Sequence, residues 1–139
     1  MSTWETMTNE DVLKAWDAGE LVWTCEQGGM GPGYEQCIQV MGFEMLRAML
    51  KNPLDDWSKV SGEEGRDEWR KYSDLIEADP VVKACIGQLH PSGAQFGAAM
   101  NIAAVFAQNG YAEGMAKVPE DRRMMVSKNF PQFDAAAVG

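Results

Sequence analysis

The chain has 139 residues and a formal net charge of −9, because 21 Asp and Glu residues outweigh 12 Lys and Arg residues. Its hydrophobic content of 45% is enough for one packed core and excludes wholesale disorder. No apolar run reaches the roughly 20 residues that a membrane-spanning helix needs. So acidic a chain also disfavours direct binding to nucleic acid, because proteins neutralise phosphates mainly with Lys and Arg. We therefore expect one domain over residues 1–139.

Two further features indicate where such a chain works. Residues 1–10 contain neither a basic residue nor an apolar segment, so the sequence predicts no secretory signal. The three cysteines, Cys25, Cys37 and Cys85, are odd in number and lack the paired spacing of disulfide frameworks and zinc sites. We expect a cytoplasmic protein without a metal or cofactor.

The first third of the chain predicts two helices separated by a strand and a glycine-rich loop. Thr8 is a typical N-cap residue, and Gly19 ends the helix that it begins. The β-branched and aromatic residues at 21–25 predict a short strand. Residues 34–51 follow a helical pattern that is apolar almost all round, which places them either in the core or in an interface between copies of the chain. The sequence is therefore compatible with both a monomer and a homo-oligomer.

The remaining sequence predicts three shorter helical segments. Residues 61–64 form a capping-box pattern before a charged amphipathic helix that ends near Ala78. Asp79 and Pro80 begin a short helix. A second capping box at 92–95 opens an uncharged helix, rich in small residues, that we expect to be the most buried of the chain.

After these helices, the sequence predicts a helical turn at Pro119, a second short strand at 124–127 and a frayed tail at 131–139. Together the elements predict a mainly α fold: a single-domain bundle of four to five helices with a short two-stranded β ribbon.

The glycine-rich loop is one candidate ligand site. Four glycines within six residues join the predicted strand to the long helix, where backbone N–H groups can bind an anion. The loop lacks both the P-loop ending and the dinucleotide-binding order of glycines, and a tight turn explains the glycines equally well. If it binds a ligand, the residues involved are Glu26, Gly28, Gly29, Gly31, Gly33, Tyr34 and Glu35.

Cys37 and His90 are the obvious candidates for a nucleophile and its base, since His90 is the only histidine. Cys37 falls on the apolar stripe of its helix, where a cysteine usually acts as a small hydrophobe. His90 precedes a proline in a connection between helices. We therefore expect no catalytic residue.

A second candidate site combines acidic and aromatic residues. Residues 53–80 carry nine acidic and four basic residues, a net charge of −5, interleaved with three large aromatic side chains. Such a segment is either a solvated helix face or an anionic surface for a basic partner, since aromatic anchors ringed by charge are typical of interface hot spots. The predicted partner-binding residues are Asp55, Asp56, Trp57, Glu63, Glu64, Trp69 and Tyr72.

Two motifs give the chain a family resemblance. The glycine-rich segment at 28–35 and the small-residue segment at 92–99, together with 118–123 and 126–131, resemble small uncharacterised proteins carried by phages and prophages. The resemblance touches about a third of the chain and carries no known activity. It implies an accessory role, such as interference with a host or defence machine, in the host-cell cytoplasm.

Three functions follow. The leading hypothesis is a non-enzymatic, anti-CRISPR-like inhibitor whose acidic face binds a basic nucleic-acid-binding protein or nucleoprotein complex. The second is a small ligand-binding domain or enzyme that uses the loop at 28–33. The third is a phage structural or assembly component.

Overall fold

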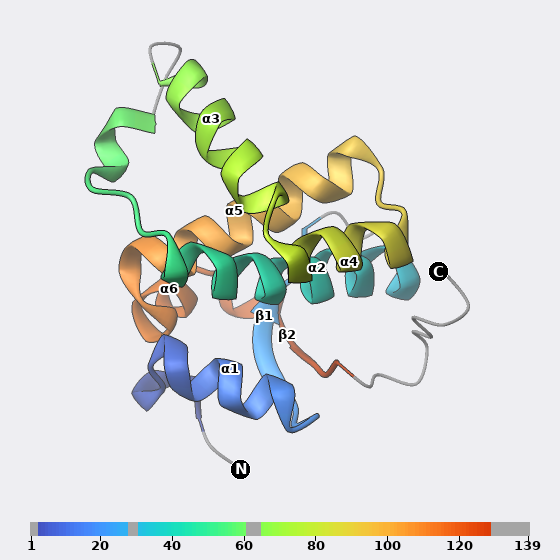
Figure 1. The fold of residues 1–139 in the computed structure, drawn as a ribbon. Helices are drawn as coiled ribbons and strands as arrows, with labels where there is room; N and C mark the ends of the chain where they lie inside the picture. The colour runs from blue at the N-terminus through green and yellow to red at the C-terminus, as the bar shows by residue number, and fades with distance from the viewer. Residues whose placement is uncertain (1–2, 28–30, 61–64, 129–139) are drawn as a thin grey trace.

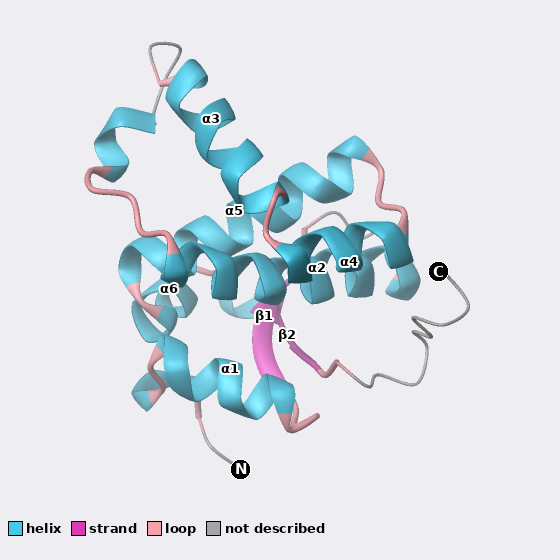
Figure 2. Cartoon of the chain, viewed as in Figure 1, coloured by secondary structure: helices cyan, strands magenta, loops and turns pink. Residues whose placement is uncertain are grey.

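The computed structural model describes residues 3–27, 31–60 and 65–128 of the chain. This part is mainly α-helical with one short two-stranded antiparallel sheet, as the sequence predicts (Figures 1 and 2). The α-helices are α1 (Asn9–Asp17), α2 (Pro32–Lys51), α3 (Arg66–Glu77), α4 (Pro80–Leu89), α5 (Gly93–Asn109) and α6 (Tyr111–Ala116). The strands are β1 (Val22–Cys25) and β2 (Arg123–Val126). Three 3-10 helices are η1 (Trp4–Thr6), η2 (Trp57–Val60) and η3 (Glu120–Arg122).

Helix α2 is the centre of the molecule. From Glu35 to Met49 every residue except Arg47 is buried, and α2 packs most extensively against α5 and also contacts α1, α3 and α4. Its apolar faces are thus covered within a single chain. At Gly42 an added Cβ would lie 3.5 Å from the Ile102 side chain and 3.6 Å from the Ala99 carbonyl, so the two helices are in direct contact there.

The expectation that the helix opened by Ser92 is the most buried one is wrong. Helix α5 buries one side against α2, but Asn101, Val105 and Gln108 are exposed. Gly97 and Gly93 have nothing within 4 Å of an added Cβ, so they mediate no close approach of another helix. Helix α2 is more buried because other helices and the two-stranded sheet surround it, whereas α5 has solvent on one side.

The two-stranded β sheet joins distant parts of the chain. Val22 pairs with Val126 and Cys25 with Arg123 in an antiparallel register, so the second strand lies one residue earlier than predicted. Two buried glutamines of α2 donate hydrogen bonds to backbone carbonyls at the sheet. Gln39 donates to the Cys25 carbonyl at 2.9 Å, and Gln36 donates to the Ser127 carbonyl at 2.7 Å. The sequence pattern identified α2 by its apolar residues, but these polar residues fix the sheet to it.

A buried carboxylate of α2 joins three segments of the chain. Glu44 is 5% exposed and accepts a hydrogen bond from the Trp16 indole at 3.1 Å. Lys128 lies 3.2 Å from Glu44 and 3.6 Å from Asp17, while Arg47 lies 2.5 Å from Asp17 and 3.5 Å from Glu44. Two cations thus balance two carboxylates. The network ties α1, α2 and the segment after β2 together.

The start of one helix and the presence of another differ from the prediction. Helix α3 begins at Arg66 with Gly65 in the N-cap position, and the predicted capping box at 61–64 lies outside the described residues. The short helix α6 was not predicted. It begins directly after Gly110, whose φ of 86° ends α5, and six residues are too few for an apolar periodicity to be recognised. The helical turn predicted at Pro119 is the 3-10 helix η3.

Helices α1 and α3 lie at opposite ends of the molecule, with α2 and α5 between them (Figure 1). Within residues 3–27, 31–60 and 65–128, no helix combines the length and the apolar character needed to cross a membrane.

Candidate functional site

The three aromatic residues of the predicted partner-binding segment come together. Trp57 of η2 and Trp69 of α3 both pack on the ring of Tyr72, with ring centroids 5.8 Å and 6.3 Å away. Trp69 and Tyr72 are three residues apart on one helical face, which predicts their contact. The position of Trp57 depends on the 3-10 helix η2, which is not among the predicted elements.

Tyr72 is the buried member of this aromatic cluster. Its side chain is 5% exposed, and its hydroxyl donates to the Asn52 carbonyl at the end of α2 at 2.7 Å. Burial raises the pKa of Tyr72 to about 12. Tyr72 therefore positions the two tryptophans and is too buried to anchor a partner by itself.

The tryptophans form one wall of a groove against α5. This groove, called the α5 groove below, has a volume of about 540 Å³ and runs between the η2–α3 segment and the exposed side of α5. The η2–α3 side consists of Trp57, Ser58, Val60, Arg66 and Trp69, so it includes one cation, and Ala104 and the amides of α5 line the other side. Both tryptophans are half-buried, so each keeps part of its ring accessible. The sequence pattern does not predict α5 as the second wall.

Two exposed carboxylates precede η2. Asp55 and Asp56 are both exposed, and Asp56 accepts hydrogen bonds from the Ser58 hydroxyl at 2.6 Å and the Ser58 backbone N–H at 3.0 Å. These hydrogen bonds lower the pKa of Asp56 still further below neutral pH, where a carboxyl group is already ionised. Asp56 thus provides a fixed negative charge beside Trp57. The other two predicted acids, Glu63 and Glu64, lie outside the described residues.

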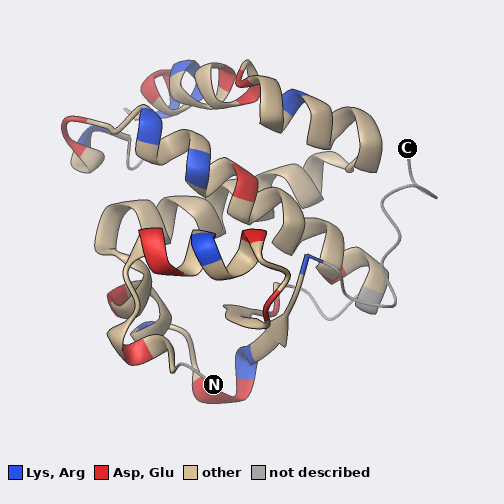
Figure 3. Ribbon diagram, turned by 60° about the horizontal axis from the view of Figure 1, so that its bottom comes forward, with Lys and Arg blue, Asp and Glu red and all other residues tan. Residues whose placement is uncertain are grey.

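Negative charge is spread over several elements of the molecule, as Figure 3 shows. On α3 it is balanced locally, since Lys71 lies 3.5 Å from Glu68 and two arginines share the helix. Asp55 and Asp56 are the exposed carboxylates that directly precede Trp57 in the chain, with Lys59 as the nearest base along the chain.

The glycine-rich loop is partly outside the described residues, because they exclude Gly28 and Gly29. Gly31 has a φ of 117°, a conformation that favours glycine, and it forms the N-cap of α2. Gly33 has open space around it.

The three polar residues proposed around this loop are not equivalent. Glu35 is buried, and its carboxylate accepts a hydrogen bond from the Gln27 backbone N–H at 3.0 Å. It thus holds the strand end against the start of α2. Tyr34 and Glu26 are half-buried. Tyr34 packs against the core, and Glu26 lines a cavity on the other side of β1.

The three cysteines belong to the buried core of the molecule. Cys25, Cys37 and Cys85 are all buried, and burial raises the pKa of each thiol, that of Cys85 to about 12. His90 is exposed and ends α4 with a left-handed φ of 48°. Among the described residues no hydrogen bond joins Cys37 to His90, and no group of three His, Cys, Asp or Glu side chains could hold a metal ion.

Neither a protein-family model, nor a curated protein, nor a solved structure matches this chain. Its function therefore has to follow from its own side chains. Four of the seven predicted partner-binding residues, Asp55, Asp56, Trp57 and Trp69, belong to the η2–α3 region, and they are called the docking face below.

Proposed function

We propose that the chain is a non-enzymatic interaction protein of phage-accessory type, which acts in the host cytoplasm by binding a basic protein through the docking face. The observation that carries the proposal is the position of two half-buried tryptophans in the wall of a 540 Å³ groove, directly beside two exposed carboxylates. The partner expected from this chemistry is a nucleic-acid-binding protein or nuclease complex, as for an anti-CRISPR-like inhibitor.

The proposed binding has two steps with different physical origins. The net charge of −9 attracts a basic surface over about one Debye length, roughly 8–10 Å at physiological salt. Asp55 and Asp56 then orient the partner. An apolar or aliphatic side chain of the partner enters the α5 groove and packs on Trp57 and Trp69, because aromatic rings in a hollow are typical binding hot spots.

Inhibition follows from competition. A protein that binds nucleic acid presents Lys and Arg side chains to phosphates. If the docking face covers those side chains, the partner loses its nucleic acid without any chemical step. This mechanism needs no cofactor and no catalytic residue, and it fits cysteines that are all buried with raised pKa values.

The test is a capture experiment from a bacterial host lysate with the full chain and charge-matched variants. Asp55→Lys/Asp56→Lys reverses the docking face. Glu10→Lys/Glu20→Lys makes the same change in net charge at exposed positions of the α1 end. Lys59→Glu adds negative charge at the docking face, and Trp69→Ala removes one wall of the groove. Thermal melting of each variant checks that it is folded.

We expect the wild type, the α1 control and Lys59→Glu to capture the same basic nucleic-acid-binding protein, while the docking-face reversal and Trp69→Ala lose it. Equal capture by the docking-face reversal and the α1 control would refute the proposed face. Capture of a phage structural protein instead would favour a role in assembly.

A further inference from the structure

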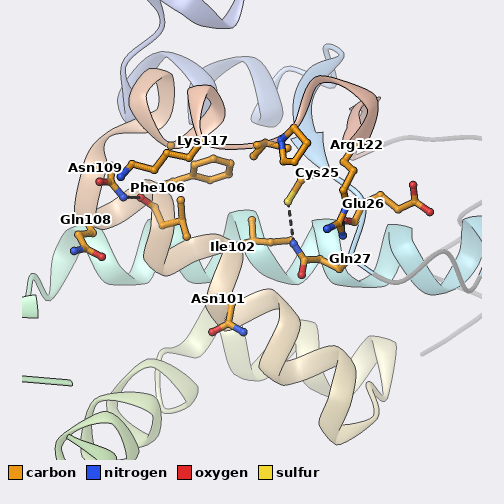
Figure 4. A pocket seen from close by; sticks show the side chains of 14 residues that line it. Cys25, Glu26, Gln27, Asn101, Ile102, Phe106, Gln108, Asn109, Lys117 and Arg122 are labelled. Atoms are coloured by element: carbon orange, nitrogen blue, oxygen red, sulfur yellow. Dashed lines mark hydrogen bonds between the residues drawn. The ribbon is translucent and has the colours of Figure 1, made fainter. Parts of the chain in front are cut away.

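A second cavity lies on the other side of α5 and has the properties of a small-molecule site. Its volume is about 410 Å³, within the range of roughly 300–1,000 Å³ that is common for ligand pockets. It lies between α5, the end of β1 and the connection from α6 to η3 (Figure 4). We call it the Lys117 cavity. The exposed amides Asn101 and Gln108 line both this cavity and the α5 groove, so they mark the border between the two.

The floor of the Lys117 cavity is apolar and rigidly packed. Ile102 and Phe106 of α5 are 3% and 1% exposed, and both line the cavity. The Phe106 ring also packs on the buried Tyr111 ring, with centroids 5.1 Å apart. A cavity whose floor is fixed by core residues is pre-formed, which lowers the cost of binding a ligand.

The charged side chains at the cavity are mostly cationic, in contrast to the acidic chain. Lys117 and Arg122 line it from opposite ends, and the one acidic side chain of the lining, Glu26, points away from it (Figure 4). Within the described residues neither Lys117 nor Arg122 forms an ion pair. Glu120 and Asp121 precede Arg122 in the same turn, but they do not line the cavity.

Arg122 is held in place by backbone groups. Its guanidinium donates to the Glu26 carbonyl, and the Glu26 N–H donates to the Arg122 carbonyl at 2.9 Å. These contacts orient the side chain without neutralising its charge. Amide side chains such as Gln27 and Asn109 add hydrogen-bonding groups around the rim.

We propose that the Lys117 cavity binds a small organic anion with an apolar ring system, whose carboxylate or phosphate group is held by Lys117. The apolar floor takes the ring, because burying it removes apolar surface from water. Lys117 takes the anionic group, since hydrogen bonds between charged groups are the stronger ones. Arg122, at the other end of the cavity, adds positive charge that favours an anionic ligand. This site is separate from the docking face and does not depend on the function proposed for it.

The test uses isothermal titration calorimetry of the full chain with three probes that share one ring system. These are 1-naphthyl phosphate, 1-naphthoate and the neutral 1-naphthol. We expect one saturable site for at least one of the two anions and an affinity for 1-naphthol that is weaker by roughly tenfold, the effect of one lost charged contact. The ranking of the two anions distinguishes a phosphate ligand from a carboxylate ligand.

Variants locate the site. Lys117→Gln should weaken binding of the preferred anion by roughly five- to tenfold and leave 1-naphthol binding unchanged, and Arg122→Gln should weaken binding of the anion by a smaller factor. Lys83→Gln, at an exposed cation of α4 that does not line the cavity, is the matched control and should bind as the wild type does. Lys117 is exposed, so its variant keeps the test valid even if Arg122→Gln disturbs the β1 end. The absence of saturable anion binding, or equal affinities in Lys117→Gln and Lys83→Gln, would overturn the proposal.

Discussion

Single buried polar groups determine how the elements of this chain are joined. Gln39 ties β1 to α2, Glu44 ties α1 and the segment after β2 to α2, and Tyr72 ties α3 to the end of α2. Each of these groups has a partner, as buried polar groups require, because an unpaired one costs about 1–3 kcal/mol. The polar residues of the core therefore specify which surfaces meet.

Tyr72 gives the clearest prediction at this scale. Its pKa is about 12 in the folded chain, against about 10 in an unfolded chain. Between these values the folded state holds a proton that the unfolded state loses, so this residue's contribution to stability is complete below pH 10 and is lost as pH rises toward 12. We expect Tyr72→Phe to cost about 1 kcal/mol at pH 7 by removing one hydrogen bond.

The same variant should flatten the alkaline loss of stability by an amount on the order of 2 kcal/mol between pH 10 and pH 12. Urea unfolding of both proteins at several pH values measures this difference. Parallel curves for wild type and Tyr72→Phe would show that the Tyr72 hydroxyl is not buried in the folded state.

At the scale of elements, the packing of α6 on α5 depends on a missing side chain. A Cβ added at Gly114 would lie 2.7 Å from Cδ1 of Phe106 and 3.3 Å from Cγ1 of Val105, which is closer than such atoms pack. Gly97, in the interior of α5, has open space instead. The two positions therefore form a matched pair for the same substitution.

We expect Gly114→Ala to destabilise the fold by roughly 1–3 kcal/mol through overpacking. Gly97→Ala should stabilise it by roughly 0.5–1 kcal/mol, because alanine loses less conformational freedom in a helix. Thermal and urea unfolding measure both values. If the two variants shift stability in the same direction, the close contact between α5 and α6 is incorrect.

The elements that the sequence predicted well are those with strong local signals. Thr8 and Ser92 cap their helices through capping boxes, with Asp11 and Gln95 as the reciprocal partners. The apolar stripe of α2 predicted its burial. The exposed side of α5 was missed because the helix carries no charged residue, so no charged face marks the side that meets solvent. The helix α6 was missed because its buried residues, Tyr111, Gly114 and Met115, span little more than one helical turn.

At the scale of the whole molecule, the candidate sites were only partly predictable. The aromatic segment was found because Trp57, Trp69 and Tyr72 are close in sequence. The α5 groove and the Lys117 cavity were not, because their walls come from segments that only tertiary folding brings together. Glu26 was predicted as a ligand residue of the glycine loop, but it lines the Lys117 cavity with its carboxylate turned away (Figure 4).

The proposed function depends on the charge of the molecule acting together with one local face. A net charge of −9 alone gives weak and unspecific attraction to any basic surface. Specific binding needs the carboxylates of Asp55 and Asp56 to meet cations while a side chain of the partner fills the α5 groove. These two contributions affect different rate constants, since charge mainly sets the association rate and packed anchors mainly set the dissociation rate.

The most direct test is therefore a measurement of both rate constants with the captured partner, at about 0.05 M and about 0.5 M salt. For the wild type we expect association to slow steeply as salt rises. Asp55→Lys/Asp56→Lys should associate roughly tenfold more slowly at low salt and show a flatter salt dependence than Glu10→Lys/Glu20→Lys. Trp69→Ala should raise the dissociation rate and leave association nearly unchanged. Identical rate constants for the two charge-reversed proteins, together with an unchanged dissociation rate for Trp69→Ala, would contradict the docking face.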